Sequence, residues 1–263
     1  MNTRPPAVAG TFYPDDPTAL RMMVQGYFDE ATDAPQIACP PRALIGPHAG
    51  YAYSGAVAGS AYRHLRGQHS AIRRVVLLGP AHRVSFAGLA TVSASSFSTP
   101  LGPVPVDQAA IDSIGHLPFV SIHDRAHEPE HCLEVHLPFL MEILDRWSLV
   151  PLLFGQISYN LVARVIEALW SDEQTLIVVS SDLSHYHDYD TATQLDRHTA
   201  RAIETNQLHK IGPHQACGHT AIQGLLAIMS QSHLRAHCVD LRNSGDTSGP
   251  TDRVVGYGAF LVH

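Results

Sequence analysis

The stretch RVVLLGPAH, from Arg74 to His82, decides the fold class. Its residues from Val75 to Leu78 are continuously apolar and partly β-branched, which is typical of a strand buried on both faces of a sheet. A Gly-Pro turn ends the run, and His82 follows it. The shorter stretch LIGPH, which ends at His48, has the same arrangement. The sequence therefore predicts two buried strands that each end in a histidine-bearing loop.

Other apolar runs alternate with segments of helical periodicity along the chain. Strands are expected at 148–156, 175–180 and 253–263, and helices at 14–31, 55–65, 107–117, 160–170, 191–206 and 217–232. Asp16 is expected to cap the first helix, with Pro17 in its first position. This alternation predicts an α/β fold with a central mixed, largely parallel sheet flanked by helices on both faces. No linker or repeat divides the chain, so residues 1–263 are expected to form a single domain.

Two segments are less regular. The segment from Leu133 to Trp147 has helical periodicity, but Pro138 inside it predicts a kink or a late start. Residues 182–190 are rich in Asp, Ser and His, and they are expected to form a polar loop after the strand at 175–180.

Composition excludes several classes of function. The net charge is −7 and Lys and Arg number 17, which argues against a nucleic-acid-binding surface. No apolar run approaches the about 20 residues of a membrane span, and the N-terminus has no signal-like apolar core. The four cysteines, Cys39, Cys132, Cys217 and Cys238, show no CxxC pairing. A reducing cytoplasm is therefore expected, with the cysteines present as thiols.

Histidine is unusually frequent, at 18 of 263 residues. Such enrichment is consistent with metal ligation or proton chemistry. It is also consistent with surface substitution of lysine, because Lys210 is the one lysine in the chain. Composition alone does not decide between these interpretations.

The positions of the strand-end histidines suggest a site. If the strands ending at His48, at His82 and at the Asp182–His185 loop are parallel, these loops share one edge of the sheet, where open α/β folds bind ligands. Neutral imidazoles favour iron, copper, zinc or nickel. The anionic partner could be Asp182, Glu134 or Cys217. Cys217 precedes a predicted helix, whose N-terminal dipole is expected to favour a thiolate.

Each of these residues also has a purely structural interpretation. His48 and His82 could be hydrogen-bonded turn residues, and Cys217 a small buried apolar residue. Asp182 and His185 could cap a helix. His131, Glu134 and His136 lie three and five residues apart, unlike the i, i+4 pair of a helical zinc site. The chain contains no Walker loop, GxGxxG or GxSxG motif, so no nucleophile motif supports a hydrolase.

Seven blocks in order give the chain a family resemblance: AGTFYP, GPHAGYAYSG, LLGPAHR, EHCLEVHLPFL, VVSSDLSHY, CGHTAI and GYGAFLVH. Together they resemble the Memo family, which in bacteria and archaea is the B protein of the AmmeMemoRadiSam system. The resemblance runs essentially from end to end. It implies a fold similar to that of the class III extradiol dioxygenases, with a central mixed sheet and a metal pocket.

The resemblance also implies roles for particular residues. His48, His82 and Cys217 match metal-binding positions, with the thiol in place of the carboxylate of the dioxygenases. A soft thiolate shifts the preference toward copper, zinc or low-valent iron, so Fe(II) or copper is expected, with zinc as an alternative. His185 is expected to act as acid/base or fourth ligand, and Asp182 to orient a histidine. The residues expected to line the substrate pocket are Glu134, His136 and Phe12, which stands where eukaryotic relatives have tryptophan.

Two functions from different classes follow. The first is a metal-dependent oxidoreductase related to the extradiol dioxygenases. The alternative is a non-catalytic binding or scaffold protein that uses the same pocket for a peptide, a small molecule or a radical SAM pathway partner. The resemblance implies radical SAM and AMMECR-like proteins as pathway partners for either one. Neither nucleic acid nor membrane is expected as a partner.

Overall fold

A computed structural model describes residues 2–31, 40–67, 71–170 and 172–263. Cys39, and residues 34–39 of the loop before the first buried strand, lie outside the described residues. Within the described ranges, the main sheet has nine strands, in the order β10-β12-β2-β9-β3-β8-β4-β7 with β11 beside β12. Their bounds are β2 (Ala43–Gly46), β3 (Arg74–Pro80), β4 (Leu89–Thr91), β7 (Val120–Ile122), β8 (Ser148–Phe154), β9 (Thr175–Ser180), β10 (His185–His187), β11 (Ala236–Asn243) and β12 (Val254–Val262).

The middle of this sheet is parallel. Strand β9 pairs in parallel with both β2 and β3, and β3 pairs in parallel with β8. The sheet becomes mixed on either side, because β12 is antiparallel to β2 and β4 is antiparallel to β8. The predicted mixed, largely parallel sheet is therefore confirmed. Since β2, β3 and β9 run the same way, the loops that follow them lie at one edge.

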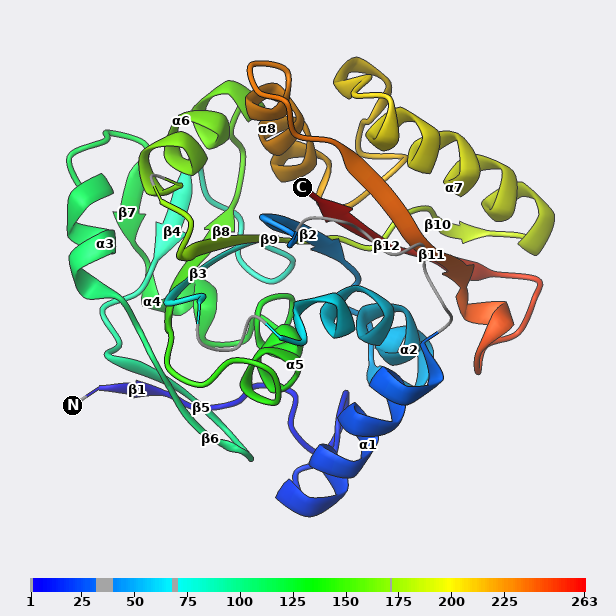
Figure 1. Cartoon of the computed structure of the whole chain (residues 1–263), viewed down its shortest axis with the longest axis horizontal. Helices are drawn as coiled ribbons and strands as arrows, with labels where there is room; N and C mark the ends of the chain where they lie inside the picture. Colours follow the sequence, from blue (N-terminus) through cyan, green and yellow to red (C-terminus); the bar gives the residue numbers. More distant parts are fainter. Residues whose placement is uncertain (1, 32–39, 68–70, 171) are drawn as a thin grey trace.

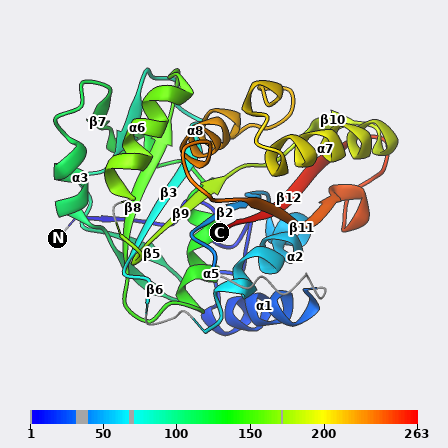
Figure 2. The same cartoon turned by 45° about the horizontal axis from the view of Figure 1, so that its top comes forward.

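Helices cover both faces of the sheet, as predicted (Figure 1). One face carries α6 (Tyr159–Leu169), α7 (Tyr189–Glu204) and α8 (His219–Met229), and the other carries α1 (Pro17–Glu30), α2 (Tyr51–Tyr62) and α5 (Leu137–Met141). The turned view in Figure 2 shows the same division. The shorter helices are α3 (Gln108–Ile114), α4 (Asp124–His127) and the 3₁₀ turns η1 (Arg63–Leu65), η2 (Glu134–His136), η3 (Leu208–Lys210) and η4 (Ser244–Asp246). No helix in the described ranges combines the length and the apolar character that a membrane span requires.

A second, smaller sheet fixes the start of the chain. It consists of β1 (Thr3–Arg4), β5 (Ser96–Thr99) and β6 (Gly102–Pro105) in the order β1-β5-β6. Arg4 pairs with Phe97 in this sheet, and its guanidinium stacks over the Phe97 ring at 5.2 Å. The N-terminal residues are thereby brought beside segments more than 90 positions away in the sequence.

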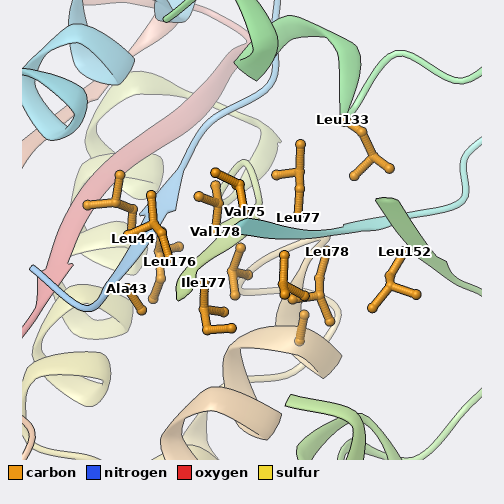
Figure 3. Close-up of a cluster of buried hydrophobic side chains, with 14 of the residues drawn as sticks. Ala43, Leu44, Val75, Leu77, Leu78, Leu133, Leu152, Leu176, Ile177 and Val178 are labelled. Atoms are coloured by element: carbon orange, nitrogen blue, oxygen red, sulfur yellow. The ribbon is translucent and has the colours of Figure 1, made fainter. Parts of the chain in front are cut away.

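Strand β3 is buried on both faces, as its continuous apolar run predicts. Figure 3 shows Leu77 and Leu78 on opposite sides of the strand, with Leu133 on the side of Leu77. Both leucines have no solvent exposure. Truncating either one to alanine is expected to cost about 2–5 kcal/mol, because the strand is packed from both sides.

The small residues of α2 allow it to pack closely on α1. A Cβ atom at Gly59 would lie 2.7 Å from the carbonyl oxygen of Tyr27 and 2.8 Å from its Cβ. A side chain at this position would therefore push the two helices apart.

Several predicted boundaries hold and others do not. Asp16 caps α1, with its Oδ1 accepting from the backbone N–H of Ala19 at 2.7 Å, and Pro17 is the first helical residue. The predicted long helix from Leu133 is wrong, because a 3₁₀ turn precedes α5 and α5 ends at Met141. The late start expected from Pro138 is confirmed, since a proline has no N–H and fits the first turn of a helix.

Strands β10 and β11 are among those that the sequence prediction missed. Residues His185–His187, expected to be loop, form β10 against β12. Strand β11 pairs with β12 over most of its length, although Asp240 and Arg242 interrupt its apolar pattern. Partly exposed strands of this kind lack the continuous apolar run that marks β3.

Candidate metal centre

Three imidazoles meet at the carboxyl edge of the parallel strands. The ring centroids of His48 and His82 lie 5.1 Å apart. The ring centroid of His131 lies 5.7 Å from that of His48 and 5.0 Å from that of His82. One ring nitrogen from each of the three lies within 4.8 Å of the others. The loops after β2 and β3 thus converge as the parallel sheet predicts, and the segment before η2 adds His131.

His48 is a buried and neutral imidazole. Its Nδ1 lies 2.6 Å from Ser180 Oγ, and that hydroxyl donates its proton to the carbonyl of Cys132 at 2.7 Å. The hydroxyl can therefore only accept from His48, so the ring proton is on Nδ1 and Nε2 keeps its lone pair. Burial, together with the rings of His82 and His131, holds the pKa of His48 well below its usual range.

His82 is held by a carboxylate. Its Nδ1 lies 3.0 Å from Glu130 Oε1, and its backbone N–H donates to Oε2 at 2.6 Å. Burial alone would raise the pKa of Glu130, but the His131 and His82 side chains outweigh burial and hold that pKa well below its usual range. Glu130 is therefore an ionised acceptor.

Cys217 contacts the histidine cluster at His48. Its Sγ lies 3.4 Å from His48 Nε2 and accepts from the backbone N–H of Asp182 at 3.3 Å. Burial, followed by the charge of Asp182, raises the pKa of the Cys217 thiol to about 12. The expectation that a helix dipole favours the thiolate is therefore wrong for the metal-free protein, because burial outweighs the hydrogen bonds that stabilise the anion.

Asp182 forms hydrogen bonds with both His48 and Cys217. Its Oδ1 accepts from the backbone N–H of His48 at 2.8 Å, and its carbonyl accepts from the backbone N–H of Cys217 at 3.2 Å. Its other oxygen, Oδ2, lies 3.9 Å from His48 Nε2, and burial raises the pKa of its carboxyl. His185, the first residue of β10, is half-buried.

Of the residues expected to line the pocket, Phe12 lies closest to the rings. Its centroid is 4.9 Å from that of His131, at an interplanar angle of 62°. His136 is buried, with Nδ1 2.8 Å from Tyr62 Oη, and burial lowers its pKa to about 3. Its Nε2 has no hydrogen-bond partner in the described part of the chain.

Glu134 faces a different set of groups. Its carboxylate, which has no solvent exposure, pairs with Arg4 and accepts from the backbone N–H of Ala7 at 2.7 Å and of Val8 at 3.0 Å. It also accepts from Tyr13 Oη at 2.5 Å. Glu134 therefore anchors the N-terminal segment that contains Phe12. Both of its carboxylate oxygens accept hydrogen bonds from that segment.

Sequence reasoning missed Glu130 and Ser180 and gave His131 no role. The spacing of His131 does not match a helical zinc motif. The segment after His131 is not a long helix, because it begins with the three-residue 3₁₀ turn η2. The signal that could have found it is the acidic and imidazole pair Glu130-His131 beside a predicted apolar segment. His82, Glu130 and Cys132 form a second group of ligand atoms within 4.8 Å.

The donor set fits a transition metal. Two imidazoles whose Nδ1 atoms are paired to acceptors, a third imidazole and a thiol offer the nitrogen and sulfur ligands that iron, copper and zinc accept. Among the described residues, Cys217 belongs to no group of three whose ligand atoms all lie within 4.8 Å, although it contacts His48.

Fold and cluster together define an α/β protein with a candidate metal site at the carboxyl edge of its parallel strands. A family model described as "Memo-like protein" matches residues 4–261. The chain is 33% identical over 271 residues to a MEMO1 family protein of Aquifex aeolicus, covering 98% of each. It is 31% identical to a MEMO1 family protein of Metallosphaera sedula and 32% identical to one of Archaeoglobus fulgidus, covering 97% and 98% of each chain. The chain belongs to the Memo family, which confirms the resemblance seen in its seven blocks.

Proposed function

We propose that this protein is a metal-dependent oxidoreductase whose site is built on His48, His82 and Cys217. The observation that supports it is the meeting of the His48, His82 and His131 ring nitrogens within 4.8 Å, with the Cys217 thiol 3.4 Å from His48 Nε2. Fe(II) or copper is the metal that we propose, with zinc as the alternative, because a thiol beside imidazoles suits these softer ions.

The chain's own residues prepare the site for such an ion. Bound iron or copper would supply one-electron redox chemistry and open positions for a substrate. Cys217 must lose its proton when it binds a metal, and Asp182 lies next to it. We assign to the half-buried His185 the exchange of a proton with a substrate. Phe12 forms one wall of the proposed pocket, with its ring packed edge-on against His131.

Metal analysis of untagged protein tests the metal site directly. We expect close to one iron or copper per chain in the wild type and its loss in the His48→Ala, His82→Ala double variant. A stoichiometric metal that persists in the double variant would contradict the assignment. Oxygen consumption with Fe(II) or Cu(I), measured across catechols and simple reductants, tests the reaction. Turnover that disappears in Cys217→Ala supports the oxidoreductase.

A second candidate is a binding protein without turnover. Two exposed aromatic side chains favour it: Tyr186, which is 63% exposed, and Tyr53, which is 43% exposed. Arg253 lies over the Tyr186 ring at 4.6 Å, and Tyr186 follows His185 directly. In this candidate, these exposed aromatic side chains hold a small molecule, a peptide or a partner such as a radical SAM or AMMECR-like protein in a reducing cytoplasm. Stoichiometric metal without any oxygen consumption would favour this candidate.

A further inference from the structure

The carboxylate of Glu130 is buried behind two of the three imidazoles. Its Oε2 accepts from the backbone N–H of His82 at 2.6 Å. Its Oε1 lies 3.0 Å from His82 Nδ1 and accepts from the backbone N–H groups of His131 at 3.0 Å and Cys132 at 3.2 Å. One side chain therefore joins the loop after β3 to the segment before η2.

The three backbone N–H groups can only donate, so both oxygens of the carboxylate act as acceptors. His82 must then carry its ring proton on Nδ1, which leaves the lone pair of Nε2 free. Nδ1 of His131 lies 3.1 Å from the same oxygen, although it is not aligned for a hydrogen bond. The same carboxylate oxygen therefore lies near Nδ1 of both rings.

Residues 130–132, which begin with Glu130, also support His48. Cys132 donates its backbone N–H to Glu130, and its carbonyl accepts from Ser180 Oγ, which in turn accepts from His48. On the far side, the Arg4 guanidinium donates to the carbonyls of Glu130 and His127. Residues 130–132 are thus fixed by the N-terminal strand and act on both imidazoles that belong to the proposed site.

We propose that Glu130 is the positioning residue of this site, setting the tautomer and orientation of His82 without binding the metal itself. The inference rests on the proposed metal function. Glu130 also adds a negative charge behind the ligands, which favours a bound cation. Direct ligation by Glu130 would compete with its three backbone N–H donors, which would then be buried without an acceptor.

Nuclear magnetic resonance of the metal-free protein tests the tautomer without any metal. In protein labelled with ¹⁵N at histidine, we expect His82 to show a protonated Nδ1 and an unprotonated Nε2. Exposed Glu128, two residues away, supplies the matched control. Glu130→Gln should abolish this single-tautomer signature, while Glu128→Gln should keep it. Finding the His82 proton on Nε2 in the wild type would overturn the proposal, whether or not any variant folds.

Zinc affinity, measured by competition with a chromophoric chelator, is the second readout. We expect Glu130→Gln to weaken zinc binding by about 10–100-fold, the range typical of partners behind metal ligands. Glu130→Asp should recover part of that loss, and Glu128→Gln should leave the affinity unchanged. Unchanged affinity in Glu130→Gln would overturn the proposal. Complete loss of zinc with the His82 tautomer preserved would also overturn it, because Glu130 would then be a ligand.

Failure of the proposed function gives a different result. A wild-type protein that binds no zinc, iron or copper would contradict the metal site itself. The tautomer of His82 would still decide whether Glu130 positions the ring.

Discussion

Cys217 Sγ and His48 Nε2 lie 3.4 Å apart, although the two residues are 169 positions apart in the sequence. The contact joins the loop after β2 to the turn that precedes α8. Both residues are tied to Asp182, His48 through its backbone N–H and Cys217 through its backbone N–H and its sulfur. The pair is therefore held by backbone contacts to a single residue.

Metal binding by Cys217 should be coupled to proton release. Burial raises the thiol pKa to about 12, so the metal-free protein holds the proton throughout the neutral range. Binding a cation must expel that proton, and apparent zinc affinity should rise by about tenfold for each pH unit. We expect this slope between pH 7.5 and 8.5, above the ordinary histidine pKa of about 6.5. Calorimetry in buffers of different ionisation enthalpy would count the protons.

Cys217→Ala is the control for this coupling. It should bind zinc more weakly and show a flatter pH dependence over the same interval. A wild-type affinity that does not change between pH 7.5 and 8.5 would contradict ligation by the Cys217 thiolate.

The N-terminal segment should depend on one buried ion pair. Glu134→Gln leaves the Arg4 guanidinium buried without its partner, which is expected to cost about 3–5 kcal/mol of unfolding free energy. Urea denaturation measures this cost. Glu142→Gln is a matched control, because its partner Arg21 is largely exposed and the loss should stay below about 1 kcal/mol. Equal losses in the two variants would show that the buried Arg4 pair adds no more stability than the exposed Arg21 pair.

Features that depend on neighbouring residues in the sequence can be predicted, whereas features that depend on contacts between distant residues cannot. The run from Val75 to Leu78 identifies a buried strand by itself, and the shared direction of β2, β3 and β9 places His48 and His82 at one edge. Glu130 could not be placed in this way, because its partner His82 is 48 positions away and no spacing rule links them. The Cys217 pKa was misjudged for a related reason. A helix dipole can be inferred from the sequence, whereas burial becomes known only when the chain is folded.

Two glycines on packed helices should respond in opposite directions to alanine. Gly59→Ala places a Cβ 2.7 Å from the Tyr27 carbonyl oxygen, so we expect a loss of about 1–3 kcal/mol. Gly26→Ala, on α1, meets nothing within 4 Å and should gain up to about 1 kcal/mol from helix propensity. Thermal denaturation would separate the two signs. A stabilised Gly59→Ala variant would mean that α1 and α2 are less closely packed than described.

Asp196 should make stability depend on pH in the acidic range. It is buried beside the residue that precedes β10, where it accepts from the backbone N–H of Ser184 at 3.0 Å and from Ser184 Oγ at 3.1 Å. Burial raises its pKa from 3.8 to about 6, so the folded state holds this proton more tightly than the unfolded state does. The resulting stability is fully present below about pH 4 and is lost as pH rises to 6. A shift of about two pKa units corresponds to about 3 kcal/mol.

Asp196→Asn isolates this contribution, because the amide oxygen can still accept from Ser184 but cannot ionise. We expect the free energy of unfolding of the variant, relative to the wild type, to increase by up to about 3 kcal/mol between pH 4 and pH 7. Chemical denaturation at the two pH values measures the difference. A constant difference across the range would show that Asp196 ionises in the folded protein as easily as in the unfolded chain.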